Sequence, residues 1–518
     1  MRRCSRSSWP KARPSTADRV VIKRALWLVL GLLLLLAAAV AVNTWRQGSR
    51  QLDVPAAPPV AVDERSVADK LAGAIRFQTV SSLEDAQLNA EEFRKFHAYL
   101  EQRFPKVHAT LRREVVGGLS LLYTWPGSDP KALPIMLMAH QDVVPIAPGT
   151  EPNWKASPFA GETKGGFVWG RGAWDDKGNL ISQLEALEML VGEGFKPRQT
   201  IYLASGADEE VGGLRGAAQI VKLLQSRNVR LDFVIDEGLL ITDGIMPGLN
   251  QPAALIGIAE KGYMSVVLKV PATPGHSSMP PPAGQSAIGM MSAALRRLDD
   301  EQLPAAIRGV AREMFQTVAP EMSGFGRVAL SNLWLFGPLV QAQLEKGAST
   351  NAMLRTTTAL TIVNAGNKDN VLPGNAEATV NFRLLPGDTR DSVMQHVKAK
   401  VANDKFELKA LDGGAEPSPI SPTQSDSYRL VNRTVRSLFP GTIVAPGLMI
   451  GATDSRYYSA ISDHVYRFSP VRAKPEDLPR FHGTNERIAT SNLAELVRFY
   501  HQLLRNASAA PASVSASS

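Results

Sequence analysis

Cysteine is almost absent from this chain of 518 residues, since Cys4 is the only one. An intramolecular disulfide framework and a thiolate metal cluster both need several cysteines, so both are excluded. Any metal site must therefore use His, Asp and Glu side chains. Histidine is also scarce, with eight in the whole chain, which makes a histidine inside an acidic cluster informative.

Two hydrolase motifs are missing as well. The chain has no G-x-S-x-G elbow, which counts against an esterase or a serine peptidase. It has no H-E-x-x-H pair, which counts against a protease with a single zinc bound on a helix. The hydrophobic fraction of 44% is ordinary for a globular protein, so wholesale disorder is excluded, and the length is enough for two or three domains.

The net charge is small once the N-terminus is set aside. Of the net charge of +8, residues 1–24 carry +7, from eight Lys and Arg against Asp18. The rest of the chain is nearly neutral, so the high isoelectric point gives no support to nucleic-acid binding. We expect residues 1–24 to be a basic cytoplasmic segment.

An apolar run follows directly, from Ala25 to Val42. Its 18 residues can just span a hydrocarbon core about 30 Å thick, so residues 25–45 are predicted to be a single transmembrane anchor. The basic residues precede it, which places the rest of the protein on the extracytoplasmic side, periplasmic or lumenal. The alternative is a signal peptide cleaved after Ala39–Ala41, but the run is longer than a signal core of about 7–15 residues.

The flanks of the main body differ from it in composition. Residues 46–64 are polar and rich in Pro and Ala, which is typical of a stalk. Residues 506–518 are rich in Ala and Ser, and we expect them to be a disordered tail.

Short apolar runs alternate with amphipathic segments through much of the body. Continuous apolar runs at 135–139, 200–203 and 233–235 have strand length, and apolar residues at helical spacing occupy 179–191 and 213–225. This alternation predicts an α/β domain with a mostly parallel sheet flanked by helices. We assign residues 65–262 and 416–505 to this catalytic domain.

Residues 263–415 have a different pattern and are predicted to be an inserted lid domain. Strand, helix, two strands, helix and strand follow one another, which is typical of an α+β ferredoxin-like unit. Extra helical material is expected at 300–346. Its apolar run Leu333–Phe336 could line a site for an acyl group or belong to the core.

Five short clusters bring hard or borderline metal ligands together with glycine, which lets the chain bend sharply after a strand. They lie at 139–145, 170–178, 208–213, 235–238 and 481–486. Histidine and carboxylate without thiolate is the ligand chemistry of a hydrolytic zinc site. A site with two metals needs a bridging carboxylate, terminal ligands and a free general base, and these clusters contain each of them.

These clusters resemble the co-catalytic zinc metallopeptidase family that includes aminoacylase, carboxypeptidase S and glutamate carboxypeptidase. The motifs GRGAWDDKG, DEEVGG, IDEG, EKGY, PGHSS, YRFSP and HGTNE look closest to the subgroup of carboxypeptidase S and N-fatty-acyl-amino-acid synthase/hydrolase. The resemblance covers roughly residues 65–505. It implies an enzyme with two Zn²⁺ per subunit, for which Co²⁺ or Mn²⁺ could substitute.

The resemblance also implies a role for each ligand. His140, Asp175 and Asp236 would hold the first zinc, and Asp175, Glu210 and His482 the second, with Asp175 bridging the two. Both zincs would keep an open position for water.

Other positions match residues that assist the reaction in the family. Glu209 would be the general base, taking a proton from a water activated by the zincs and returning it to the leaving amine. Asp142 would orient the His140 imidazole. His276 would steady the oxyanion from the lid.

Three further residues would hold the carboxylate of the substrate: Asn370, Arg383 and Arg456. Arginine suits this task because its planar fork binds a carboxylate at two points. If these groups and the metals lie on different domains, the enzyme must close to work.

The function expected is hydrolysis of an amide bond in a small peptide or an N-acyl amino acid with a free carboxylate. The protein would act as a carboxypeptidase, a dipeptidase or an N-acyl-amino-acid amidohydrolase, either as a monomer or as a homodimer formed through the lid. The alternatives are an anchored binding protein of the same fold without activity, and an esterase.

Overall fold

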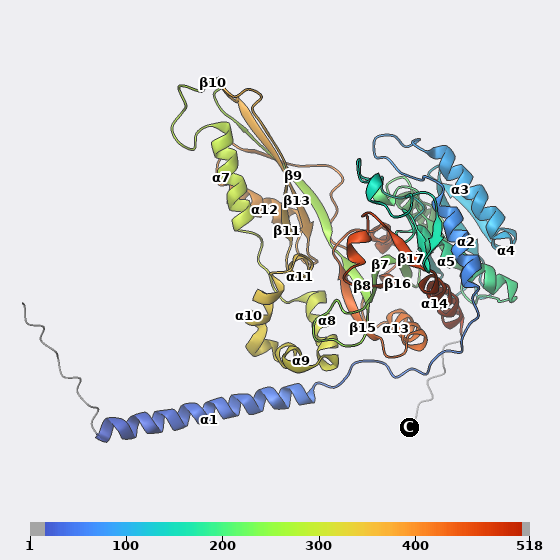
Figure 1. The fold of residues 1–518 in the computed structure, drawn as a ribbon, viewed down its shortest axis with the longest axis horizontal. Coiled ribbons are helices and arrows are strands. Elements are labelled where there is room, and N and C mark those ends of the chain that lie inside the picture. The colour runs from blue at the N-terminus through green and yellow to red at the C-terminus, as the bar shows by residue number, and fades with distance from the viewer. Residues whose placement is uncertain (1–15, 510–518) are drawn as a thin grey trace, which may run out of the picture.

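The computed structural model describes residues 16–509. Cys4, most of the basic segment 1–24 and the end of the tail 506–518 lie outside the described residues. Figure 1 shows a large unit on the right, a smaller unit beside it, and the long helix α1 extending away below them.

The helices and strands have the following bounds. The helices are α1 (Thr16–Arg46), α2 (Glu64–Ile75), α3 (Ala90–Arg103), α4 (Pro105–Thr110), α5 (Lys177–Gly192), α6 (Ala217–Ser226), α7 (Ala287–Asp300), α8 (Gly309–Val318), α9 (Gly324–Ser331), α10 (Leu333–Leu344), α11 (Ala348–Leu354), α12 (Arg390–Val401), α13 (Asp426–Leu438) and α14 (Thr490–Ser508). The strands are β1 (Arg112–Val116), β2 (Ser120–Trp125), β3 (Ile135–Met138), β4 (Glu162–Lys164), β5 (Phe167–Trp169), β6 (Ile201–Ser205), β7 (Val234–Thr242), β8 (Ala253–Glu260), β9 (Gly262–Pro271), β10 (Gly275–His276), β11 (Thr357–Ala365), β12 (Val371–Leu372), β13 (Asn375–Leu384), β14 (Glu407–Ala410), β15 (Ile443–Met449), β16 (Val465–Ala473) and β17 (Arg487–Ala489). Short 3₁₀ turns near the site are η2 (Glu209–Val211), η4 (Asp454–Ala460) and η5 (Leu478–Arg480).

Within the described residues, the large unit is built on an eight-stranded sheet with the order β1-β2-β6-β3-β7-β16-β8-β15. At its centre, β3 is parallel to β6 and β7, and β16 is parallel to β7. At one edge, β1, β2 and β6 are antiparallel neighbours. The sheet is therefore mixed, whereas the sequence predicted a mostly parallel one. One source of the difference is the β1–β2 hairpin, which turns at Gly117 and Gly118 with positive φ at both. The other is β8, which is antiparallel to β7 and β16. Strand–helix alternation predicts neither.

Strand β3 shows why the run 135–139 is apolar throughout. Ile135 and Leu137 belong to a hydrophobic cluster shared with α2, α5 and α14, whereas Met136 and Met138 belong to another shared with α6. Successive side chains of a strand face opposite sides of the sheet. A strand with helices on both faces must therefore be apolar at every position, and the strand predicted here is confirmed.

Strands β9, β11, β13 and β14 form the sheet of the smaller unit, in the antiparallel order β11-β13-β9-β14. Helices α7 and α12 share a separate hydrophobic cluster with β9 and β13. The chain order β9-α7-β11-β13-α12-β14 is the βαββαβ arrangement of ferredoxin-like units. Figure 1 shows this unit reaching away from the large one, with β10 at its far end.

Helices α8, α9, α10 and α11 interrupt the smaller unit between α7 and β11. Helix α8 packs against β15, at the edge of the large sheet, through Met314, Phe315 and Val318. In contrast, no described residue of α10 is buried. The run Leu333–Phe336 is therefore not part of the core, which was one of its two interpretations.

The anchor and the stalk expected from the sequence lie within the described residues, and so does the start of the tail. Helix α1 contains one stretch, Arg19–Arg46, that is long and apolar enough to cross a membrane by length and composition. Residues 46–64, expected as a stalk, run along the large unit, where Gln51 Nε2 donates to Val444 O at 3.0 Å and Ala57 N donates to Ser437 O at 2.9 Å. Helix α14 continues three residues into the predicted tail, because it ends at Ser508.

A buried ion pair joins the large sheet to the loop that precedes η4. Arg467 on β16 donates through Nε to Glu260 Oε2 at 2.9 Å, and both side chains are buried. The same carboxylate oxygen accepts hydrogen bonds from Thr453 N at 3.1 Å and Thr453 Oγ1 at 3.0 Å. Glu260 therefore fixes the start of the segment that carries Asp454 and Arg456.

We expect Glu260→Gln to lower the free energy of unfolding by about 3–5 kcal/mol, because it leaves the buried Arg467 without its countercharge. The matched control is Asp463→Asn, which removes an exposed partner of Arg230 and should cost only about 0–1 kcal/mol. Denaturant unfolding of the purified protein measures both. Equal losses in the two variants would contradict the role given to Glu260.

Candidate metal centre

Part of the candidate site comes from three neighbouring strands of the large sheet. His140 follows β3, η2 with Glu209 and Glu210 follows β6, and Glu237 lies in β7. These strands are adjacent in the sheet, so their carboxyl ends meet at one edge, which is where open α/β sheets bind ligands.

Asp175 lies at the centre of the cluster and contacts two imidazoles. Its Oδ1 lies 2.9 Å from His140 Nε2, and its Oδ2 lies 2.8 Å from His482 Nε2. Glu210 Oε2 lies 3.4 Å from the same nitrogen of His482. The structure thus brings together four of the five predicted ligands: His140, Asp175, Glu210 and His482.

Glu237 occupies the place that the sequence analysis gave to Asp236. One ligand atom each of His140, Glu209 and Glu237 lie within 4.8 Å of one another, as do those of Asp175, Asp176 and Glu237. Asp236 is in none of these groups. Its Oδ2 instead accepts a hydrogen bond from Ser455 N at 3.1 Å.

The reason for this difference lies in the register of β7. Its pairing with β16 is irregular after Asp236, because Arg467 pairs with Asp236 whereas Phe468 pairs with Leu239, so Glu237 lies in an irregularity of the strand. Glu237 faces His140, whose Nε2 lies 3.7 Å from its Oε1. The sequence DEG contains both acids, and only the register of the strand distinguishes them.

Asp142 contacts both His140 and the loop of the expected base. The His140 ring nitrogen Nδ1 lies 2.9 Å from the backbone oxygen of Asp142 and 3.4 Å from its carboxylate. The two carboxylate oxygens accept hydrogen bonds from Glu209 N and Glu210 N, both at 3.1 Å. Asp142 therefore orients the imidazole mainly through its backbone, and its side chain positions η2.

The electrostatics of the cluster reflect its burial. Although burial disfavours a charged imidazole, the neighbouring carboxylates raise the pKa of His482 to about 10. Burial raises the pKa of Glu209 and that of Glu237, and nearby acids, Asp454 for the first and Asp175 for the second, add to this. Acidic groups thus outnumber the cationic ones that could balance them.

Divalent cations fit this arrangement. Glu210 Oε1 is buried and has no hydrogen-bond partner among the described residues. Burying an unpaired anionic oxygen is unfavourable unless a cation or donor faces it. Ligands consisting of imidazole and carboxylate, without thiolate, suit Zn²⁺ and related metals.

A second buried ion pair holds the loops of Asp175 and His482 together. Glu486 accepts hydrogen bonds from Trp174 N at 2.9 Å, Asp175 N at 3.1 Å and Arg171 Nη1 at 2.6 Å. Arg171 also donates to the backbone oxygen of His482 at 3.1 Å. His482 has a φ of 56°, a conformation that non-glycine residues adopt rarely and that surrounding contacts must hold.

Of the residues expected to hold the substrate carboxylate, Arg456 lies beside η2 and Arg383 lies in β13 of the smaller unit. Arg456 donates to Gly212 O at 2.8 Å, directly after η2. Arg383, at the base of β13, stacks over the Tyr263 ring at 4.8 Å from its centroid. Burial, followed by the neighbouring charge of Arg456, lowers the pKa of Arg383.

His276 and Asn370 lie elsewhere. His276 is in β10, which pairs with β12 at the far end of the smaller unit (Figure 1), and Ser277 N donates to Asn370 O there at 3.1 Å. Strand β9 runs from the junction to this end over ten residues, about 33 Å at the usual rise. The structure therefore does not bring these two residues to the metal cluster.

Three residues near the site were not predicted from the sequence. Glu237 and Glu486 belong to the clusters 235–238 and 481–486, so the sequence did contain a signal that pointed to these two residues. Asp454 lies between Gly206 and Gly213, and its carboxylate oxygens fill the space where a Cβ would stand at those glycines. The two glycines thus make room for a buried carboxylate.

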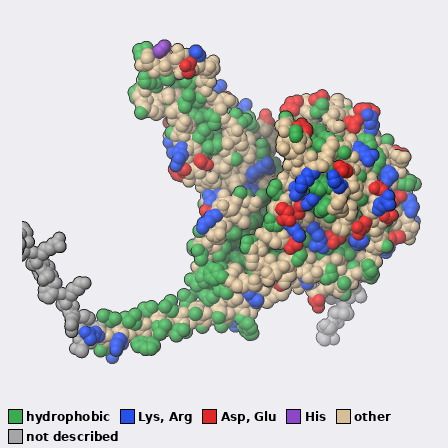
Figure 2. Space-filling view, viewed as in Figure 1, with side chains coloured by type: hydrophobic (Ala, Val, Ile, Leu, Met, Phe, Trp, Pro, Cys, Tyr) green, Lys and Arg blue, Asp and Glu red, His purple; other side chains and the backbone are tan. Residues whose placement is uncertain are grey.

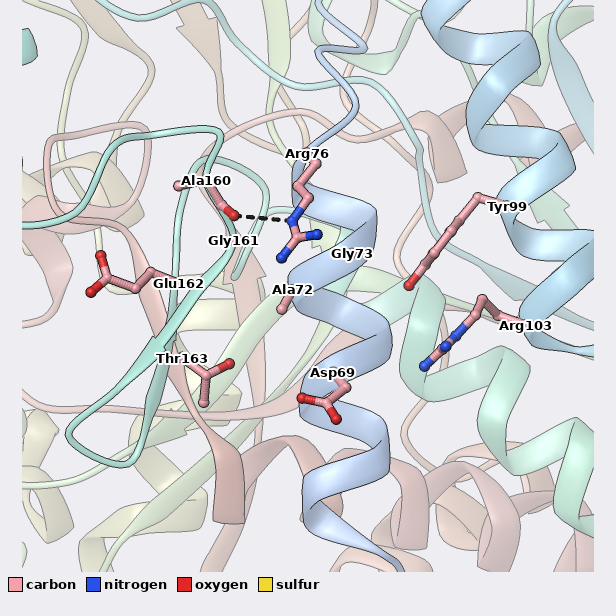
Figure 3. A pocket seen from close by; sticks show the side chains of 10 residues that line it. All are labelled: Asp69, Ala72, Gly73, Arg76, Tyr99, Arg103, Ala160, Gly161, Glu162 and Thr163. Carbon is pink, nitrogen blue, oxygen red and sulfur yellow. Dashed lines mark hydrogen bonds between the residues drawn. The ribbon is translucent and has the colours of Figure 1, made fainter.

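A pocket on another face lacks such chemistry. It lies between α2, α3 and β4, and Figure 3 shows Arg76 at its centre, donating to Ala160 O at 3.2 Å. Its lining contains no histidine. The functional site is therefore assigned to the cluster around Asp175.

Comparison with known proteins agrees with this assignment. Residues 136–506 match the model of peptidase family M20/M25/M40. The chain is 43% identical to N-fatty-acyl-amino acid synthase/hydrolase PM20D1 of Xenopus tropicalis over 86% of each protein. It is 30% identical to carboxypeptidase S of Saccharomyces cerevisiae, over 85% of this chain and 83% of that one.

Solved structures show the same fold. Human carnosine dipeptidase 1 superimposes with a TM-score of 0.61 at 16% identity, covering 87% of this chain and 100% of that one. With the family model spanning most of the chain and the competent residues gathered around Asp175, the chain belongs to peptidase family M20/M25/M40 and is a hydrolytic enzyme.

Proposed function

We propose that the protein is a membrane-anchored hydrolase that holds two zinc ions and cleaves the amide bond of N-acyl amino acids. The observation that carries this proposal is the contact of one buried carboxylate, Asp175, with two imidazoles at 2.9 Å and 2.8 Å, next to further carboxylates. A shared carboxylate between two sets of terminal ligands is what a two-metal site requires.

The ligands divide into two sets around Asp175. His140 and Glu237 would hold one ion, and His482 and Glu210 the other, with Asp175 shared. Glu237 replaces Asp236 in this proposal because it faces His140. When bound, the ions would supply Lewis-acid polarisation of the carbonyl and lower the pKa of a water at the site.

Glu209 would move the proton. It belongs to the group of ligand atoms formed with His140 and Glu237, yet the ions can be held without it. The backbone N–H of Glu209 is bonded to Asp142, which positions Glu209. Because the Glu209 carboxylate would not bind a metal, its charge would not be neutralised by one. A carboxylate in this position accepts a proton from the attacking water and returns it to the leaving amine.

Arg383 and Arg456 would bind the free carboxylate of the substrate. They come from the two units, β13 of the smaller one and η4 of the larger one, and Arg456 contacts the loop of Glu209 and Glu210 through Gly212. A substrate carboxylate held between them would lie beside the metals. Arginine binds such groups at two points, which fixes orientation as well as affinity.

His276 and Asn370 would assist only after a large movement. Both lie at the far end of the smaller unit, so this unit would have to swing over the metals as a lid, or a second copy would have to supply them. The enzyme would therefore close during turnover, as a monomer or as a homodimer formed through the lid.

The substrate class is inferred from the relatives. N-fatty-acyl-amino acid synthase/hydrolase is the more similar protein, at 43% identity, and carboxypeptidase S is at 30%. We therefore place N-acyl amino acids first and small peptides with a free carboxylate second. Both have an amide bond next to a carboxylate, which is what the metals and the arginine pair would bind.

Helix α1 would anchor the enzyme. None of its apolar window is buried in the protein, and basic residues precede it, so the positive-inside rule places the catalytic unit on the extracytoplasmic side. Cleavage after Ala41 would release the same unit on that side.

We expect Glu209→Gln to retain two zinc ions per chain while kcat falls by about 10²–10⁴-fold, because the amide cannot accept the proton. The matched control is the adjacent substitution Glu210→Gln, which should lose metal as well as activity. Elemental analysis and amide hydrolysis assays measure both. Activity close to that of the parent enzyme in Glu209→Gln would refute the assignment of the base.

A substrate panel tests the proposed specificity. We expect hydrolysis of N-acyl amino acids and, more slowly, of Gly-X dipeptides, with activity lost to a chelator and restored by Zn²⁺. Blocking the substrate carboxylate as an amide should lower kcat/KM by about 10–100-fold. This factor corresponds to the loss of a hydrogen bond to a charged group, which contributes about 1.5–3 kcal/mol.

Arg383→Met should lower kcat/KM for the free acid by the same factor and change kcat/KM for the blocked substrate little. The reason is that the substitution and the blocking group remove the same interaction between arginine and carboxylate. Arg230→Met, at an exposed ion pair, is the control and should change neither. If Arg383→Met lowered kcat/KM equally for both substrates, the arginine would not be a carboxylate ligand.

A further inference from the structure

The helical pair α9–α10 presents an apolar surface that no part of the described chain covers. Trp334 is 61% exposed, Leu339 58% and Phe325 62%, and no residue of α10 is buried. Residues 333–344 include no charged side chain. A helix that is apolar all round is normally buried in protein or in lipid, so this pair lacks its partner.

The turn between these two helices is bonded to the end of α1. Asn43 Nδ2 donates to Ser331 O at 2.7 Å, and Gln47 Nε2 donates to the same oxygen at 2.8 Å. Asn332 Nδ2 donates in return to Thr44 Oγ1 at 2.9 Å. Several hydrogen bonds thus fix the helical pair against the last turns of α1.

These bonds set the depth of the pair relative to a bilayer. The apolar run of α1 ends at Val42, so Asn43–Gln47 mark the level at which the helix would leave the hydrocarbon. Trp45 at this level is 82% exposed, and exposed tryptophans are typical of membrane–water interfaces. Figure 2 shows hydrophobic side chains along α1 continuing onto the neighbouring helices.

We propose that the helical pair α9–α10 lies in the outer leaflet beside α1 and seats the enzyme on the membrane surface. The partner is a lipid bilayer, because the apolar surface is continuous with that of the anchor and free of charge over α10. An interfacial helix buries its apolar face about 5–10 Å below the headgroup boundary. Helix α8, which packs on β15, would connect this seat to the catalytic sheet.

This inference relies on the proposed anchor, so its test must separate the two. The full-length protein with Cys4→Ser has no other cysteine, and single cysteines are introduced at Leu339, at Leu30 in α1, and at Leu83, which is exposed on the large unit. Each is labelled with an environment-sensitive fluorophore. The proteins are reconstituted in phosphatidylcholine–phosphatidylglycerol vesicles with and without doxyl-labelled lipid, and thermal unfolding checks the fold of each variant.

We expect the label at Leu339 to emit at shorter wavelength and to be quenched by doxyl lipid, as at Leu30, while the label at Leu83 remains unquenched. Quenching at Leu30 but not at Leu339 would overturn the seat and leave the anchor intact. A shift at Leu339 without quenching would mean that protein, such as a second copy, covers the pair, which also overturns the proposal. Without quenching at Leu30 the anchor fails, and the seat fails with it, because α1 sets the depth of the helical pair.

Discussion

Two imidazoles contact the two oxygens of one buried carboxylate, and the rest of the site depends on this arrangement. His140 and Asp175 are 35 positions apart, whereas Asp175 and His482 are 307 apart. Their meeting requires the end of β3, the loop before α5 and the loop after η5 to be held together. A carboxylate shared in this way concentrates negative charge where burial makes it costly, which is why the cluster suits divalent cations.

Buried ion pairs next to the site supply the required rigidity. Arg171 and Glu486 join the loops of Asp175 and His482, and Glu260 with Arg467 fixes the segment of Asp454 and Arg456. Such pairs are weak evidence for overall stability, because desolvation offsets their attraction. Their value here is positional, since they hold backbone groups of the catalytic loops in one geometry.

The sequence predicted the parts of the structure that depend on local pattern. The apolar runs identified β3, β6 and β7, and the spacing of His, Asp and Glu after them identified most of the cluster around Asp175. The prediction failed where the position of a side chain depends on strand register or strand length. Glu237 was missed in favour of Asp236 because only the pairing of β7 with its neighbours determines which acid faces His140. His276 was expected at the site, but the length of β9 places it at the other end of the smaller unit.

Anomalous diffraction from crystals of the zinc-loaded protein, recorded at the zinc absorption edge, tests the central claim most directly. The account predicts two peaks per chain, one on each side of the Asp175 carboxylate, at about 2.0–2.1 Å from His140 Nε2 and from His482 Nε2. A single peak, or peaks that do not share Asp175, would contradict it.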